Sequence, residues 1–331
     1  MKLEEFNYSL PDDLIAQHPL KDRGAARLLV LERTTGSMEH LRFHEIVRFF
    51  KPGDLLIINN TKVFRARLLG RKETGGQVEM LLLKEGEKAN KWLAMIAPAR
   101  RIRTGTKIFF DKDRYATVRQ KTGSRCTIVF NVPVDTIIKE HGSVPLPHYI
   151  KRTADESDTH FYQTVFAKKR GSIAAPTAGL HFTTEILTTL RKKDITIGEI
   201  TLHIGPGTFK PIRAEQIEDH AMEPEYYEIP HDVAQVLEKS DSITAVGTSV
   251  CRALETYAVT EHRSGSAGIF IYPGHTFKLV NRLITNFHLP CSTPLLLASA
   301  FAGKDVLMSA YRAAIERKYR FLSYGDAMLI L

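Results

Sequence analysis

The spacing of hydrophobic residues changes twice along the chain and divides it into three stretches. In the first, residues 1–58, apolar runs of strand length alternate with an apolar run of helical spacing. Its predicted elements are a short helix from Pro11 through Ala16, a strand over residues 27–33, a helix over residues 44–50 and a buried strand over residues 54–60. This order indicates the start of an α/β domain.

The second stretch, from Lys62 to about residue 149, alternates apolar and polar residues in short runs. Turn signals such as ETGG at residues 73–76 separate six strand-like runs, and no convincing helical pattern interrupts them. Short strands at this spacing are typical of a small barrel or sandwich. Two prolines in VPLPHYI, residues 144–150, indicate a linker that leaves this unit.

The third stretch returns to α/β spacing after about Arg152. Its predicted elements are a helix over residues 183–193 capped by Thr183 or Thr184, an alternating strand over residues 195–205, a strand, turn and helix over residues 242–259, a strand over residues 270–273, helices over residues 293–302 and 305–318, and a terminal strand over residues 321–331. We therefore predict a large mixed α/β domain of residues 1–59 and 150–331, interrupted by a small, basic, six-stranded β-barrel of residues 60–149.

The composition fits two domains of an ordinary globular protein, with 331 residues, 43% hydrophobic and 25% charged. No apolar run approaches the roughly 18 residues of a membrane span, and the acidic N-terminal stretch lacks an apolar signal core, so we expect a cytoplasmic protein. The three cysteines are far apart and form no C-x-x-C pair. Neither disulfides nor a thiolate metal site is indicated, and we expect no bound metal.

The positive charge of the chain is concentrated in the predicted barrel. Residues 60–149 hold 18 Lys and Arg against 8 Asp and Glu, a local net charge of +10, whereas the whole chain carries +9. A basic surface on one unit favours a polyanionic partner, and nucleic acid is the first candidate. The alternative is a solvated basic surface without a partner.

Residues 285–303, TNFHLPCSTPLLLASAFAG, join a polar segment to an apolar helix. Pro294 suits the first turn of a helix that begins near Thr293, and Gly303 suits its end. Asn286 and His288 would then lie just ahead of a helix N-terminus, beside unpaired backbone donors. This allows a pocket wall, but from this stretch alone we favour a plain helix start with a hydrogen-bonded core histidine.

Other compact segments combine polar groups with turns. Thr177 and His181 lie in APTAGLHF, and LHIGPGTF, residues 202–209, holds a lone G-x-G, which is weak evidence for a phosphate loop. In the strand before that loop, alternation places Ile200, Leu202 and Ile204 on one face and His203 on the other. Each segment has a structural alternative, a turn or a core contact.

Three further segments could carry chemistry. Glu223, Glu225 and Glu228 in HAMEPEYYEI could include a general base if one of them is buried against a tyrosine, and the alternative is a solvated edge. VGTSVCRALET predicts a helix N-terminus with Thr248 or Ser249 as its cap, a geometry that binds carboxylate or phosphate, although Arg252 could simply pair with Glu255 one turn later. YRFLSYGDAMLI, residues 319–330, gathers polar residues around Gly325.

The chain resembles the S-adenosylmethionine:tRNA ribosyltransferase-isomerase family of queuosine biosynthesis. The resemblance rests on the segments NNTKVFRARL, PLPHYI, APTAGLHF, LHIGPGTF, EYYEI, VGTSVCRALET, IYPGHTFKLVNRLITNFHLPCST and FLSYGDAML, which occur in the family's order from about Leu10 onward. The chain departs from the family pattern at His148, at Glu223 and Pro224, within residues 249–251, and at Pro294.

The resemblance implies an α/β domain interrupted by a β-barrel, and an enzyme that transfers and isomerises the ribosyl moiety of S-adenosylmethionine. The acceptor is 7-aminomethyl-7-deazaguanine at the wobble position of tRNA, and the products are epoxyqueuosine, adenine and methionine. S-adenosylmethionine is then a co-substrate, with no prosthetic group, and we expect a monomer. The alternatives are a non-catalytic tRNA-binding protein and an S-adenosylmethionine-dependent tRNA methyltransferase.

Residue chemistry together with this resemblance gives the expected site. The acid/base candidates are His181, His203, Glu225 and His288. The expected substrate-binding residues are Thr177, Gly179, Gly205, Gly207, Thr208, Tyr226, Thr248, Ser249, Arg252, Tyr272, Asn286, Phe287, Ser292, Thr293, Ser323, Tyr324 and Asp326. Thr248, Ser249 and Arg252 would hold the methionine carboxylate, and Phe287 or Tyr324 would stack on a base. The expected tRNA-binding residues are Lys62, Arg65, Arg67, Arg71, Arg100, Arg101 and Arg103.

Overall fold

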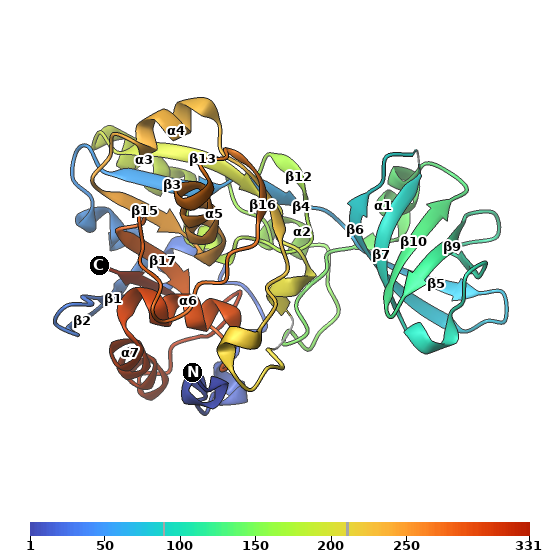
Figure 1. Ribbon diagram of the computed structural model, residues 1–331, viewed down its shortest axis with the longest axis horizontal. Helices are drawn as coiled ribbons and strands as arrows, with labels where there is room; N and C mark the ends of the chain where they lie inside the picture. Colours follow the sequence, from blue (N-terminus) through green and yellow to red (C-terminus); the bar gives the residue numbers. More distant parts are fainter. Residues whose placement is uncertain (89, 210–211) are drawn as a thin grey trace.

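The computed structural model describes residues 1–88, 90–209 and 212–331, without the side chains of residues 208 and 209. Figure 1 shows a large layered body that contains both chain ends and a separate small barrel at the right of the view. The chain runs into the barrel in blue and returns from it in green. The sequence-based prediction of a mixed α/β fold interrupted by a small β-barrel is therefore confirmed.

One mixed sheet forms the centre of the large body. Its order among the described residues is β16-β14-β13-β3-β15-β17-β18-β1-β2. These strands are β1 (Arg27–Leu31), β2 (Met38–Arg42), β3 (Leu55–Asn59), β13 (Thr196–Leu202), β14 (Glu225–Glu228), β15 (Ile243–Val246), β16 (Ser264–Ala267), β17 (Arg282–Asn286) and β18 (Ala327–Ile330). Neighbours β13, β3, β15 and β17 are parallel, so their carboxyl ends share one edge, whereas β18 runs antiparallel to β17.

Alternate residues of the central strands enter two different cores. In β3, Leu55 and Ile57 join one core, and Leu56 and Ile58 join the core on the opposite face. Helices α4 (His231–Leu237), α5 (Thr248–Thr260), α6 (Thr293–Ala302) and α7 (Lys304–Glu316) cover the first face. Helix α3 (Thr184–Lys192) and the 3-10 helices η4 (Phe43–Phe49) and η6 (Thr177–His181) cover the second. The strands are apolar on both faces because both faces are covered.

Six antiparallel strands close the barrel, as the sequence predicted, because β5 pairs with both β6 and β8. They are β5 (Arg67–Lys72), β6 (Gln77–Glu85), β7 (Lys91–Ala97), β8 (Lys107–Phe109), β9 (Tyr115–Thr122) and β10 (Arg125–Phe130). Helix α1 (Val134–His141), which the sequence analysis did not predict, buries Val134, Ile137 and Ile138 against the barrel core. It is short, and its apolar spacing covers little more than one turn.

A narrow junction joins the two parts. Strand β4 (Thr61–Val63), which precedes the barrel, pairs in parallel with β12 (Lys169–Ser172) from beyond it. The barrel closes at its base where β11 (Gly142–Ser143) pairs with the start of β5 and Ser143 lies opposite Arg67. A Cβ on Gly142 would lie 2.4 Å from the carbonyl oxygen of Ile138, so only glycine fits here. The boundaries at residues 59/60 and 149/150 remain predictions.

Several predicted elements differ in detail. The segment after Pro11 forms only a 3-10 turn, η2 (Asp12–Leu14), and the helix expected over residues 44–50 is the 3-10 helix η4. Residues 270–273 form no strand, which corrects that prediction, and the neighbouring strands are β16 and β17 instead. The remaining helix, α2 (Asp158–Phe161), is a single turn. None of the helices in the described part of the chain is long and apolar enough to cross a membrane.

Helix α6 confirms the predicted helix over residues 293–302. It runs from Thr293 to Ala302 with Pro294 in its first turn, and Gly303 follows it with φ +84°. Helix α3 is confirmed with Thr183 as its N-cap, whose hydroxyl accepts a hydrogen bond from the Ile186 N–H. Both helices carry local end signals, which is why sequence alone places them well.

Candidate active site

A cavity of about 260 Å³ opens at the carboxyl edge of the parallel strands. Its walls come from segments that follow β15 and β17, from the segment after β13 and from the turn before β18. Ligands of α/β sheets bind at this edge because the loops that follow the strands converge there. Eleven of the residues expected from the sequence line it, namely Thr177, Glu225, Thr248, Ser249, Arg252, Asn286, Phe287, His288, Ser292, Thr293 and Ser323.

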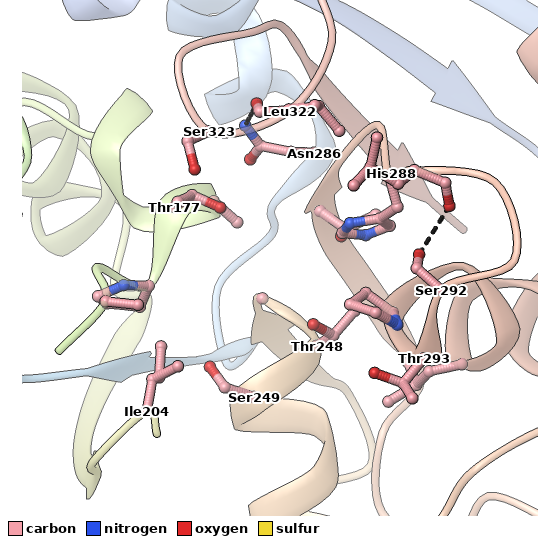
Figure 2. Close-up of a pocket in the computed structure, with 18 of the residues that line it drawn as sticks. Thr177, Ile204, Thr248, Ser249, Asn286, His288, Ser292, Thr293, Leu322 and Ser323 are labelled. Carbon is pink, nitrogen blue, oxygen red and sulfur yellow. Dashed lines mark hydrogen bonds between the residues drawn. The ribbon is translucent and has the colours of Figure 1, made fainter. Parts of the chain in front are cut away.

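The N-terminus of α5 forms one wall of the cavity (Figure 2). Gly247 is its N-cap with φ +96°, a conformation that favours glycine, and no side chain caps the helix. The prediction that Thr248 or Ser249 caps the helix is therefore wrong, because both lie inside its first turn. The first N–H groups of a helix have no partner within it and carry partial positive charge, so this wall suits an anionic group.

A buried ion pair lies beside this helix start. The Arg252 guanidinium donates from Nη2 to Glu225 Oε2, and both residues are 5% exposed. The Gly205 N–H also donates to Glu225, at Oε1 over 2.7 Å. Arg252 does not pair with Glu255, the alternative raised by their spacing, because the Glu255 carboxylate accepts backbone N–H groups of residues 278–280.

The opposite end of the cavity is polar without charge (Figure 2). The hydroxyls of Tyr149 and Ser323 lie 2.6 Å apart, and burial raises the pKa of Tyr149 to about 12, so the phenol stays protonated. The Tyr162 hydroxyl is buried nearby and finds no hydrogen-bond partner among the described residues. Asn286 donates to the Leu322 carbonyl over 2.8 Å, which fixes its amide in the wall.

His288 and His181 are uncharged at neutral pH. Burial lowers the pKa of His288 to about 3, and its Nε2 lies 2.7 Å from the Thr285 hydroxyl. Burial also lowers the pKa of His181 to about 4, and its Nε2 lies 3.3 Å from Asn286 Oδ1. His288 lines the cavity, whereas His181 lies behind Asn286, against a smaller second cavity. His181 therefore reaches the main cavity only through that amide.

Several expected site residues lie away from the main cavity. Tyr324 donates to Asp158 over 2.7 Å and Asp326 accepts from Arg27, so both hold neighbouring segments together. Phe287 reaches the cavity wall, but it is fully buried among other aromatic rings. The others outside the cavity lining are Gly179, Gly205, Gly207, His203, Tyr226 and Tyr272. The Thr208 side chain lies outside the described part of the structure.

Sequence reasoning missed Tyr149 and Tyr162, which both line the cavity. Tyr149 lies in the segment PLPHYI, which was interpreted as a linker and as part of the family resemblance, with no role for the tyrosine. Two departures from the family pattern also have a place: His148 is exposed on the lining, and Glu223 forms a 2.7 Å ion pair with Arg125 of the barrel strand β10. Among the described residues, no group of three or more His, Cys, Asp or Glu side chains could hold a metal ion.

The fold and the cavity define an α/β protein with a candidate ligand site at the sheet edge and an inserted β-barrel. The family model described as "Queuosine biosynthesis protein" matches residues 3–330. The chain belongs to this family.

Curated relatives share the full length of the chain. The S-adenosylmethionine:tRNA ribosyltransferase-isomerase of Halothermothrix orenii is 48% identical over 344 residues, and that of a Sulfurihydrogenibium species is 46% identical over 337 residues, with 100% of both chains covered in each case. The crystal structure of S-adenosylmethionine tRNA ribosyltransferase from Thermotoga maritima matches with a TM-score of 0.57 and 36% identity, covering 99% of this chain and 100% of that one.

Proposed function

We propose that this protein is an S-adenosylmethionine:tRNA ribosyltransferase-isomerase. It transfers and isomerises the ribosyl moiety of S-adenosylmethionine onto 7-aminomethyl-7-deazaguanine at the wobble position of tRNA. Epoxyqueuosine forms, and adenine and methionine are released. The observation that carries the proposal is a cavity with a charged end and a neutral polar end, in a chain whose full-length relatives bear this name. A cytoplasmic location, where tRNA is found, and a monomeric state are part of the proposal.

The charged end suits the amino-acid part of S-adenosylmethionine. Its α-carboxylate would accept N–H groups at the start of α5, where Thr248 and Ser249 line the cavity. Its α-ammonium would lie near Glu225, whose charge is balanced by Arg252 in the structure. A zwitterion matches a wall that contains both charges, because each end of the ligand then meets an opposite charge.

The neutral end suits a base or a ribose. Two tyrosine phenols stay protonated beside Ser323, because burial raises the pKa of Tyr149 and of Tyr162. If the Tyr149 hydroxyl donates to Ser323, the Ser323 proton is left for an acceptor in the cavity. Asn286 adds an amide of fixed orientation, which can donate and accept at once.

The chemistry requires a base near the donor's ribose. The sulfonium of S-adenosylmethionine acidifies the C5′ protons, and removal of one starts the rearrangement that expels adenine and later methionine. Of the four acid/base candidates, only Glu225 and His288 line the main cavity, so we keep these two. His181 would orient Asn286, and His203 has no part in this step because it lies outside the lining.

The basic barrel is the proposed grip on tRNA. Lys62, Arg71, Arg100, Arg101 and Arg103 are exposed and available to phosphates. Two other expected residues are engaged within the protein. Arg65 donates to Thr159 over 3.3 Å, and Arg67 pairs with Glu79 at 3.0 Å. Contacts with phosphate release counterions, so tRNA binding should weaken as salt rises.

Reversing two barrel charges tests this grip. The double variant Arg100→Glu and Arg101→Glu is expected to raise the KM for tRNA and to reduce the slope of log KM against log salt by about 1 to 2, since two phosphate contacts are lost. The dissociation constant for S-adenosylmethionine should not change. As a matched control, Arg191→Glu and Lys192→Glu reverse two exposed charges on α3. If the wild-type KM for tRNA does not change with salt concentration, the barrel is not part of the tRNA-binding surface.

Product analysis separates the proposed function from its alternatives. The protein is incubated with S-adenosylmethionine and tRNA that carries the deazaguanine precursor, and the small products are separated by chromatography. Adenine and methionine in equal amounts are the expected result. S-adenosylhomocysteine would indicate a methyltransferase instead, and tRNA binding without any small product would indicate a binding protein.

A further inference from the structure

Two residues expected in the substrate site lie together on the outer face of the sheet. In β14, Glu225 and Tyr227 are buried whereas Tyr226 between them is 49% exposed, because alternate residues of a strand face opposite sides. His203, just after β13, is also on the outer side, since Leu202 and Ile204 are buried. The His203 N–H donates to the Tyr226 carbonyl over 3.0 Å, which places the two residues side by side.

The two rings form a stack that the surrounding structure holds in place. Their centroids are 6.0 Å apart and their planes differ by 25°. His203 Nδ1 lies 2.8 Å from the Thr61 hydroxyl of β4, and a Cβ on Gly171 would lie 2.6 Å from the imidazole. Gly171 in β12 therefore leaves room for the His203 ring. One face of the Tyr226 ring packs on this imidazole, and the tyrosine stays partly exposed to solvent.

Basic residues lie near this stack. In β12, Lys169 pairs with Glu228 at 2.8 Å and Arg170 pairs with Asp135 at 2.7 Å, and Lys62 of β4 is exposed opposite Arg170 in the register of the two strands. Burial and the charge of Lys169 lower the pKa of His203, so its ring is neutral at pH 7. Figure 1 shows β4 and β12 between the large body and the barrel. Glu225, the neighbour of Tyr226, lines the cavity, so the stack lies close to both parts of the proposed site.

We propose that Tyr226 and His203 form a stacking platform for an unpaired base of the tRNA anticodon loop, next to the wobble nucleotide. This inference rests on the proposed function. Specific recognition of RNA uses unstacked loop bases on aromatic rings, with nearby basic residues for the backbone. When the wobble base enters the cavity, a neighbouring base loses its stacking partner. The open face of Tyr226 replaces that partner.

The test removes the ring and measures binding to an anticodon stem-loop that carries the deazaguanine precursor. Tyr226→Ala is expected to raise the dissociation constant for the stem-loop by about 5-fold to 100-fold, the range for one stacked base. Tyr226→Phe is expected to restore tight binding because it keeps the ring. The dissociation constant for S-adenosylmethionine should be the same in all three proteins. Val259→Ala, which shortens another exposed apolar side chain, is the matched control.

Abasic stem-loops identify the stacked base. For the wild-type protein, removing the base on one side of the wobble position should weaken binding by a factor similar to that of Tyr226→Ala. Combining that abasic stem-loop with Tyr226→Ala should weaken binding no further, because both changes remove one contact.

The inference is overturned if Tyr226→Ala binds the stem-loop within twofold of wild type, or if its affinity for S-adenosylmethionine falls by the same factor. Failure of the proposed function would look different. Wild-type protein would then release no adenine or methionine, whatever residue occupies position 226.

Discussion

Replacing Glu225 with alanine is expected to abolish adenine release and to lower the free energy of unfolding by about 3 to 5 kcal/mol. Arg252 is 5% exposed and would keep its charge in the interior without the carboxylate that accepts its hydrogen bond. The Gly205 N–H would lose its acceptor as well. Urea unfolding gives the change in stability, and chromatography of adenine gives the change in activity.

A double variant distinguishes charge burial from simple loss of packing. Glu225→Leu together with Arg252→Met removes both charges and should recover most of the lost stability, while activity stays absent. Ser323→Ala at the neutral end is the matched control. It should cost about 1 kcal/mol of stability, typical of one hydrogen bond, and should raise a KM rather than abolish turnover. If the free energy of unfolding of Glu225→Ala lies within 1 kcal/mol of the wild-type value, the Glu225 carboxylate does not compensate the buried charge of Arg252.

The second large expected effect is a loss of folding stability at acidic pH. Burial lowers the pKa of His181 from 6.5 to about 4, so below pH 6.5 the unfolded chain binds a proton that the folded chain does not. Stability from this residue is therefore fully present above about pH 6.5. It is lost as the pH falls toward 4, by on the order of 3 kcal/mol in total. His288, whose pKa burial lowers to about 3, acts in the same direction.

Urea unfolding between pH 4 and pH 8 measures this dependence. His181→Gln keeps an N–H donor near Asn286 but cannot take up a proton, so its stability should fall less steeply with acid than that of wild type. His262→Gln changes an exposed histidine and should leave the wild-type dependence intact. Parallel curves for wild type and His181→Gln would show that His181 is not the buried neutral group proposed here.

Local patterns explain what the sequence could predict. The alternation of short runs in residues 60–149 is enough for a six-stranded barrel, since each strand has one face in its own core. Helix α6 was placed by Pro294 and Gly303, which act within one turn of its ends. The position of Asn286 and His288 ahead of this helix allowed a cavity wall, and the family resemblance was needed to favour it over a plain helix start.

The features that the sequence could not predict depend on contacts between residues far apart in the chain. Arg252 pairs with Glu225, which is 27 residues away, and not with Glu255, which is three residues away. Glu255 instead accepts hydrogen bonds from the backbone N–H groups of residues 278–280, a contact that no sequence pattern marks. His203 was expected in the substrate site, although the alternation of its own strand already placed it on the face opposite Leu202 and Ile204, which are buried.

The base of the barrel has a consequence for how such a protein can change over time. The chain begins the barrel at Arg67 and completes it at Ser143, and these two residues lie opposite each other in one pair of strands. The chain therefore enters and leaves the barrel at one place. Such a unit can be gained, exchanged or shortened to a turn without rerouting the nine-stranded sheet. The proposed tRNA-binding surface and the proposed reaction cavity are then free to evolve at different rates.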